Sequence, residues 1–268
     1  MHASQLLRGK HVVVFGAAGS IGSVVAREFA AEGADVYLSG RSKSRLEEVA
    51  EQITADGGKA QVAIVDAEDA GAVDTYLDGV ARDAGSIDVV FNVMGPRVRD
   101  YGNGTPATQL TIDQFMLPLT TLMKSQFITS RAAARHMVEQ RSGVILFLTG
   151  SPARPHTPGS TAIGAGFGAI ENFTRSLAHE VSPHGVRVVC VRAAAMPETR
   201  TIRETRDIIV AATHIPEGQL FERLAATTLL KASPTIADTA RAAAFAASDN
   251  ARMMTGTVLN SSAGAVPD

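Results

Sequence analysis

The sequence is poor in several residue types, and each shortage narrows what the protein can be. Among 268 residues there are no tryptophans, one cysteine and three tyrosines. One cysteine cannot form a disulfide within the chain. Cys190 lies in the apolar run 188–191, where a buried, reduced thiol is the expected state.

The sequence also has no large excess of positive or of negative charge. The 25 lysines and arginines nearly balance the 27 aspartates and glutamates, for a net charge of -2. Electrostatics therefore gives no reason to expect nucleic acid or an anionic membrane as a partner. No apolar run reaches the roughly 20 residues that cross a bilayer, and residues 1–8 lack the apolar core of a signal peptide. We expect a cytoplasmic protein with a small-molecule substrate and with no nucleic-acid, membrane or metal partner.

What the chain does contain is an alternation of short apolar runs with longer helical patterns. Hydrophobic residues make up 45% of the sequence, enough for a sizeable core. This alternation predicts a parallel sheet covered by helices on both faces, and no linker divides the chain into domains. The expected strands are 11–15, 35–39, 60–65, 87–93, 144–149, 186–191 and 257–260. The expected helices are 21–32, 44–56, 68–84, 111–139, 159–181 and 236–247.

The first expected strand leads into a glycine-spaced turn that opens the first helix. Such a turn lets the backbone approach a ligand, and its last glycine lets the helix pack close to the strand. Free N–H groups at the helix start, together with the helix dipole, favour an anion such as a pyrophosphate. Glycines also mark plain turns, but the position between a strand and a helix favours nucleotide binding. The candidate residues are Gly16, Gly19, Ser20, Ile21 and Gly22.

Ligands of such sheets bind beyond the carboxyl ends of the strands, so the residues that follow the other strands are the next candidates. Arg41 follows the second strand, at a place where an acid would bind a ribose 2′-hydroxyl. An arginine there favours the 2′-phosphate of NADP(H) over NAD(H); the alternative is a solvated charge beside Arg45. Asp66 follows the third strand and either caps the next helix or touches a base. Asn92 and Gly95 end the fourth strand in a turn and are further cofactor-binding candidates.

Further motifs follow in order, and together with the glycine turn they resemble the short-chain dehydrogenase/reductase family over nearly the whole chain. They are Asp88–Gly95, Glu171–Glu180, Pro183–Val188, Ala246–Asp249 and Met254–Asn260. The resemblance implies one Rossmann-type doubly wound α/β domain over residues 1–268, with about seven parallel strands, in a homotetramer or homodimer. It also implies that Thr199, an approximate counterpart of a family threonine, meets the cofactor's carboxamide. Residues 195–228 would form a lid over the substrate.

The chain departs from the family at the residues that carry its chemistry. Active members use a serine, a tyrosine that donates or accepts a proton, a lysine that lowers the tyrosine pKa, and an asparagine from the preceding helix. Here the serine position falls on Gly150, the tyrosine on Ile163, the lysine on Phe167 and the asparagine on Leu122. Residues 163 and 167 share a helix face, so an apolar pair replaces the acid–base pair.

Few residues near this position could replace the missing acid. Thr149 and Ser151 flank the serine position and could hydrogen-bond a substrate, although capping is an equally ordinary role. His156 is the only nearby residue that titrates close to neutral pH, and a solvated loop histidine is the alternative. Tyr101 follows the fourth strand and could swing over the cleft, although packing or exposure is its ordinary role.

Two functions fit this pattern. One is an NADP(H)-dependent oxidoreductase, or a related lyase or isomerase, that acts on a small apolar carbonyl or alcohol by a non-standard mechanism. In that mechanism the protein holds the reactants in a reactive orientation. Water or a hydroxyl group then supplies the proton that the usual tyrosine would give. The other is a catalytically silent protein that senses a dinucleotide or serves as a scaffold. A replacement acid in the cleft favours the enzyme, and the lack of one favours the silent protein.

Overall fold

A single sheet of seven parallel strands forms the centre of the molecule, in the order β3-β2-β1-β4-β5-β6-β7. The computed structural model describes residues 5–154, 158–213 and 216–267. The strands are β1 (His11–Phe15), β2 (Asp35–Gly40), β3 (Lys59–Ile64), β4 (Val89–Asn92), β5 (Gly143–Gly150), β6 (Val186–Ala193) and β7 (Thr257–Ser261). The strand order reverses between β1 and β4, as in a doubly wound Rossmann-type sheet. The predicted fold class is therefore confirmed.

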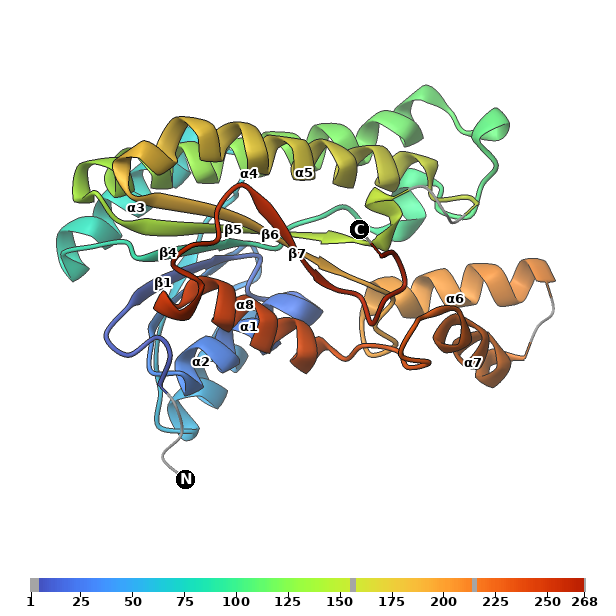
Figure 1. Ribbon diagram of the computed structural model, residues 1–268, viewed down its shortest axis with the longest axis horizontal. Coiled ribbons are helices and arrows are strands. Elements are labelled where there is room, and N and C mark those ends of the chain that lie inside the picture. Colours follow the sequence, from blue (N-terminus) through green and yellow to red (C-terminus); the bar gives the residue numbers. More distant parts are fainter. Residues whose placement is uncertain (1–4, 155–157, 214–215, 268) are drawn as a thin grey trace.

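Helices cover both faces of the sheet (Figure 1). The helices α3, α4 and α5 lie on one face, whereas α1, α2 and α8 lie on the other. The helices α6 and α7 project beyond one end of the sheet. The bounds are α1 (Ser20–Ala31), α2 (Lys43–Ala55), α3 (Ala70–Ala84), α4 (Ile112–Gln140), α5 (Thr161–Val181), α6 (Arg200–Thr213), α7 (Glu217–Thr227) and α8 (Ile236–Ala247). Among the described residues, no helix combines the length and apolar character needed to cross a bilayer.

The two faces of the sheet bury separate apolar clusters. Successive residues of a strand point to opposite faces, and β1 shows this clearly. Val13 and Phe15 belong to the cluster beneath α3, α4 and α5, whereas Val12 and Val14 belong to the cluster beneath α1, α2 and α8. All four side chains are almost completely buried. Strands that are buried on both faces explain why the apolar runs of the sequence are continuous rather than alternating.

The turn between β1 and α1 depends on glycine at two positions. Gly16 has a φ of +87°, in the left-handed region that glycine enters without steric cost. A Cβ atom at Gly22 would lie 2.3 Å from the carbonyl oxygen of Gly16, a distance that no side chain tolerates. Only glycine at this position lets the first turn of α1 pack directly against the end of β1.

Helices α6 and α7 lie in the segment for which the sequence predicted a lid and no helices. The segment 195–228 is thus largely helical, with α6 beginning directly after Thr199. Ile202 N donates to Thr199 Oγ1 at 3.2 Å, which is the bond of an N-cap. Arg203 and Asp207 are exposed on one face of α6, the arrangement of an amphipathic helix, whereas in the sequence these charges were interpreted only as a solvated surface.

Helix α3 begins two residues later than predicted, because Asp69 and not Asp66 is its cap. Asp69 Oδ1 accepts a hydrogen bond from Ala72 N at 3.1 Å. Asp66 Oδ1 instead accepts from Glu68 N at 3.0 Å, in the turn before the helix. The prediction that Asp66 caps this helix was therefore wrong, and its carboxylate serves the turn at the end of β3.

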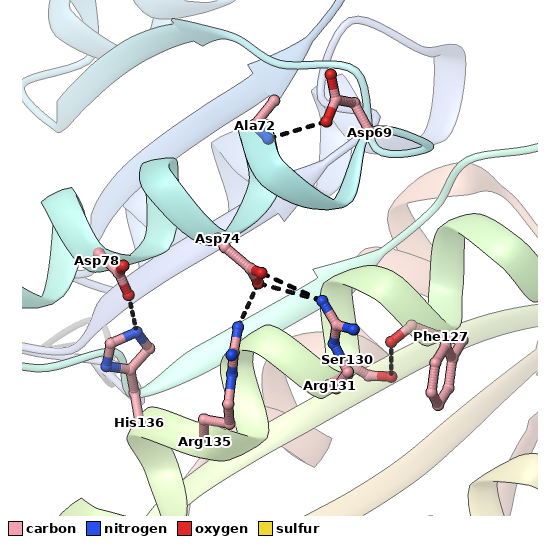
Figure 2. A network of polar contacts seen from close by, with 9 residues as sticks. All are labelled: Asp69, Ala72, Asp74, Asp78, Phe127, Ser130, Arg131, Arg135 and His136. Atoms are coloured by element: carbon pink, nitrogen blue, oxygen red, sulfur yellow. Dashed lines mark hydrogen bonds and ion pairs between the residues drawn. The ribbon is translucent and has the colours of Figure 1, made fainter.

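Ion pairs join α3 to α4, two helices on the same face of the sheet (Figure 2). The carboxylate of Asp74 accepts from Arg131 at 3.2 Å and also from Arg135, and His136 Nε2 lies 2.9 Å from Asp78 Oδ1. Pairs that remain partly exposed contribute about 0.2–1 kcal/mol each. They fix how α3 lies against α4, while the apolar cluster beneath both helices supplies most of the stabilisation.

The close packing at Gly22 yields a stability prediction. Gly22→Ala places a methyl group against the Gly16 carbonyl, and overpacking of this kind costs about 1–3 kcal/mol of unfolding free energy. Gly79→Ala is the matched control, since its Cβ would meet only Arg82 Nη2, at 3.8 Å in helix α3. We expect the control to stabilise the protein by about 0.5–1 kcal/mol. Urea denaturation measures both, and equal stability of the two variants would contradict the account of the turn.

Candidate functional site

A cleft of about 830 Å³ opens at the carboxyl edge of the sheet. The segments that follow β1, β2, β3, β4, β5 and β6 all contribute to its walls, and α6 and α7 close one side. The sequence predicted a ligand site at this edge, and the structure places the cleft there. The volume lies in the range of sites that hold a small molecule or cofactor.

The N-terminus of α1 faces this cleft without a compensating negative charge. Its N-cap is Gly19, which has no side chain to cap the helix, and its first turn contains no acidic residue. The free N–H groups and the helix dipole therefore attract an anion. The cleft is lined here by all five residues predicted from the glycine turn, Gly16, Gly19, Ser20, Ile21 and Gly22.

A second positive region lies where β2 leads into α2. Ser42, the N-cap of α2, makes no side-chain capping bond, and the first turn has no acidic residue. Arg41 and Arg45 are exposed and line the cleft; within the described part of the chain, neither side chain has an ionic partner. The hydroxyl of Ser39 is buried beside them without a hydrogen-bond partner among the described residues. This region of the cleft therefore contains two arginines without an ionic partner and a hydroxyl group without a hydrogen-bond partner among the described residues.

The other cofactor-binding candidates differ in what they present to the cleft. Asp66 and Gly95 line it. Asn92 is fully buried: its Nδ2 donates to Leu146 O at 3.4 Å, and its Oδ1 accepts from Thr129 Oγ1 at 2.6 Å. The Asn92 side chain thus joins β4 to β5 and α4 and faces the interior. Thr129 is a supporting residue that the sequence gave no sign of, because its contact joins positions 37 residues apart.

Thr199 lines the cleft but uses its hydroxyl within its own turn. Its Oγ1 donates to Met196 O at 2.9 Å and accepts from Ile202 N at 3.2 Å. The next residue connects the turn to the glycine loop, since Arg200 N donates to Ser20 Oγ at 3.3 Å. Helix α6 therefore starts directly over the start of α1. The carboxamide contact implied for Thr199 stays a prediction.

The opposite part of the cleft is apolar. Ile163 and Phe167 from α5 line it together with Leu122 from α4. A Cβ atom at Gly150 would lie 3.0 Å from Phe167 Cε2, so a serine there would require the ring to shift. The four positions at which the family has its catalytic residues do come together in space, and none of them carries an ionisable group.

A buried polar network lies one helical turn below this apolar pair. Glu171, on the same face of α5 as Phe167, accepts from Arg192 Nε at 2.7 Å and from Arg192 Nη2 at 2.8 Å. The Arg192 and Glu171 side chains are 0% and 6% exposed. Thr149 Oγ1 donates to Glu171 Oε1 at 3.2 Å and lies 3.3 Å from Cys190 Sγ. An arginine inside the apolar run of β6 was the sequence signal for this network, and it was missed.

This network limits the hydrogen bonding of Thr149 and the reactivity of Cys190. Because Thr149 gives its proton to Glu171, its hydroxyl can only accept a hydrogen bond from a ligand in the cleft. Burial raises the pKa of the Cys190 thiol to about 12, so the thiol stays protonated and unreactive, as the sequence predicted. Ser151 lines the cleft and is partly exposed. His156, the remaining catalytic candidate, lies outside the described residues.

Helix α5 packs closely on the turn that follows β5. A Cβ atom at Gly164 would lie 2.7 Å from Pro152 O, so glycine is needed for this approach. Across the part of the chain that the structure describes, no group of three or more His, Cys, Asp and Glu side chains could hold a metal ion. The polar residues that line the cleft include hydroxyl groups, the arginines after β2, and the carboxylates Asp66 and Glu68.

Comparison with known proteins agrees with this geometry. Residues 16–265 match the family model described as enoyl-(acyl carrier protein) reductase. A (5R,7aS)-5-hydroxy-7a-methyl-1-oxo-2,3,5,6,7,7a-hexahydro-1H-indene-carboxyl-CoA reductase of Mycobacterium tuberculosis is 31% identical over 261 residues, 95% of this chain and 92% of the relative. A 3-oxoacyl-(acyl-carrier-protein) reductase of Haemophilus influenzae is 27% identical over 262 residues, 96% of this chain and 98% of the relative. The chain belongs to the short-chain dehydrogenase/reductase family.

Solved structures show the same fold. An NAD+-bound xylitol dehydrogenase superposes with a TM-score of 0.87 at 24% identity, over 95% of this chain and 98% of that chain. An actinorhodin polyketide ketoreductase with NADPH superposes with a TM-score of 0.86 at 20% identity, over 96% and 97% of the two chains. At these identities the likeness concerns the fold alone.

The buried ion pair yields a second prediction. Glu171→Gln leaves the Arg192 guanidinium buried without its counter-charge, which costs about 3–5 kcal/mol of unfolding free energy. Replacing both partners by apolar residues, as in Glu171→Leu with Arg192→Met, removes that unpaired charge, so we expect the double variant to be more stable than Glu171→Gln. Urea denaturation of Glu171→Leu, of Arg192→Met and of the double variant completes the cycle that gives the coupling energy. Purely additive losses would show that the two charges do not depend on each other.

Proposed function

We propose that the protein is an oxidoreductase that binds NADP(H) in this cleft and acts on a small apolar carbonyl or alcohol compound. The observation that carries the proposal is the pair of cleft-facing arginines, Arg41 and Arg45, without ionic partners in the described structure. They lie at the same cleft as the uncapped start of α1. Two anion sites along one cleft suit a diphosphate and a ribose phosphate. The names of the two relatives, both reductases, support the same class of reaction.

The residues of the chain divide the cleft into a charged part and an apolar part. The start of α1 would hold the diphosphate, and Arg41 with Arg45 would hold the 2′-phosphate. A bound nicotinamide dinucleotide supplies or accepts a hydride. Ile163, Phe167 and Leu122 exclude water from the other part of the cleft and favour an uncharged substrate over a charged one.

The mechanism differs from that of family members with the tyrosine and lysine. No ionisable group stands at residues 163 and 167, so neither position can move a proton or lower the pKa of a neighbour. Holding the reactants in a reactive orientation can by itself supply a large part of a rate enhancement. The proton must then pass through another group at the cleft.

A catalytically silent dinucleotide sensor or scaffold is the alternative, and the apolar pair at 163 and 167 is what favours it. The two functions differ in one measurable quantity, the consumption of NADPH in the presence of an apolar ketone. Steady turnover supports the enzyme. Tight NADPH binding without turnover for any of a panel of ketones and alcohols supports the sensor.

The comparison of NADPH with NADH tests the role of Arg41. We expect Arg41→Gln to weaken NADPH binding about tenfold to a hundredfold, because a hydrogen bond to a charged group is worth about 1.5–3 kcal/mol. NADH affinity should not change. The matched control is Lys43→Gln, which removes the same charge from the same helix start but from a side chain that lies 3.6 Å from Glu47. Calorimetric titration gives the affinities; an equal loss for both nucleotides would contradict the phosphate role.

We also propose that the protein is a homodimer or homotetramer that pairs through α4. Large apolar side chains of this helix remain exposed, with Ile112 81%, Met116 42% and Phe127 49% accessible. Phe127 lies against Phe173 of α5, with ring centroids 6.1 Å apart, so the apolar surface continues onto the neighbouring helix. An apolar patch of this kind is typical of an interface between subunits.

Sedimentation velocity tests this assembly. We expect the wild type to sediment as a dimer or larger, and Phe127→Arg to shift the population towards the monomer, because a charge would be buried in the interface. Ile64→Arg is the control, since Ile64 is a similarly exposed apolar residue, 54% accessible, on the edge strand β3. A monomeric wild type, or loss of assembly only in the control, would contradict the proposal.

A further inference from the structure

The apolar part of the cleft still needs a source for the proton that a carbonyl oxygen gains on reduction. Most hydroxyl groups near it already donate their proton within the protein. Thr149 donates to Glu171, Ser125 donates to Thr121 O at 2.7 Å, and Thr199 donates to Met196 O. Ser151 lines the cleft too, but an aliphatic hydroxyl is a far weaker acid than a phenol.

Tyr101 is the phenol at this cleft. It ends a short 3-10 helix, Val98–Tyr101, which follows β4 and lies against α4 and α6. Its side chain is 4% exposed, belongs to the apolar cluster under α4 and α5, and lines the cleft. The ring is thus held firmly from several sides.

The hydroxyl of Tyr101 is free to act on a ligand. It makes no hydrogen bond with any residue that the structure describes, and it is not among the fully buried polar atoms without a partner. This oxygen is therefore not fully enclosed by the described residues, and Tyr101 is one of the residues that line the cleft. Tyr76 offers the contrast, because its hydroxyl is fully buried and unpartnered on the face of α3 that packs against the core.

We propose that Tyr101 is the proton donor of the reaction, in place of the tyrosine that the chain lacks at position 163. This inference rests on the proposed reductase function. A bound reduced nicotinamide would supply the hydride that the carbonyl carbon gains, and the π electrons of the C=O bond would pass to oxygen. The O–H bond of Tyr101 then breaks to give that oxygen its proton, and the tyrosinate regains a proton from water.

The surroundings of Tyr101 suit a donor better than a base. Burial, and then the negative charge of Glu204 on α6, raise the pKa of the Tyr101 phenol above its ordinary value. The phenol is therefore protonated at neutral pH, as a donor must be, but it is a weaker acid than a free tyrosine, so it donates only to an oxygen that has gained nearly full alkoxide charge. No lysine stands at position 167 to stabilise the tyrosinate, so removing a proton from an alcohol substrate is the harder direction. Reduction of a ketone is the expected activity.

The test compares Tyr101→Phe with the matched control Tyr76→Phe, using NADPH and the bicyclic apolar ketone 2-tetralone. Each change removes one phenolic hydroxyl and keeps a buried ring. We expect Tyr101→Phe to lower kcat by about a hundredfold or more, as for loss of a general acid, with NADPH affinity unchanged. Tyr76→Phe should stay within about twofold of the wild type, because its hydroxyl lies away from the cleft.

A second readout does not depend on turnover. Calorimetry with NADP+ present compares binding of 2-tetralone with that of tetralin, the hydrocarbon that lacks its carbonyl group. The wild type and Tyr76→Phe should prefer the ketone, and Tyr101→Phe should lose that preference, because the phenol donates to the carbonyl oxygen.

The outcomes separate the two claims. If the wild type reduces 2-tetralone and Tyr101→Phe is equally active, the assignment of Tyr101 is overturned while the reductase function stands. If the wild type binds NADPH but turns over none of a panel of ketones, the reductase function fails and Tyr101 has no proton to deliver. If NADPH does not bind, the cofactor assignment itself fails.

Discussion

The contact between the start of α1 and the end of β1 is the constraint on which the rest of the site depends. Gly22 leaves just enough space for the Gly16 carbonyl, so α1 begins at the carboxyl edge of the sheet with its N-terminus facing the cleft. The start of α6 contacts the start of α1, because Arg200 N donates a hydrogen bond to Ser20 Oγ. One compact region of backbone thereby gathers positive potential where a diphosphate can bind.

The other part of the cleft is apolar, and its described residues present no free charge to a ligand. In this chain the face of α5 that carries the acid and the cation of the family carries Ile163 and Phe167, and the first charged group on that face is Glu171, one turn farther into the protein. Its charge is neutralised by Arg192 and cannot serve a ligand. The polar network therefore orders the base of the cleft, whereas the surface that meets a substrate stays apolar. This face of α5 therefore offers no proton above Glu171, and the donor proposed here, Tyr101, lies in the segment after β4.

The sequence predicted the sheet, six of its helices and most of the charged part of the cleft, because these depend on local patterns. Continuous apolar strands, glycine spacing and Arg41 after β2 can each be read within a short window. The helices α6 and α7 escaped prediction because their segment was assigned as a lid from the family resemblance, and its charges were interpreted as a solvated surface rather than as the outer face of a helix. The partners of Thr129 and Arg192 escaped for another reason, because they lie 37 and 21 residues away. The arginine at the end of an apolar strand signals a buried charge, but a single sequence does not say which residue pairs with it. Asn92 shows the same limit, as its side chain turned out to face the interior.

A crystal structure of the complex with NADPH tests the central claim most directly. The account predicts that the diphosphate lies against the N-terminus of α1, that the 2′-phosphate contacts Arg41, and that the nicotinamide reaches the apolar part of the cleft beside Ile163 and Phe167. A complex with the nucleotide bound elsewhere, or crystals that take up no nucleotide at millimolar NADPH, would contradict the account.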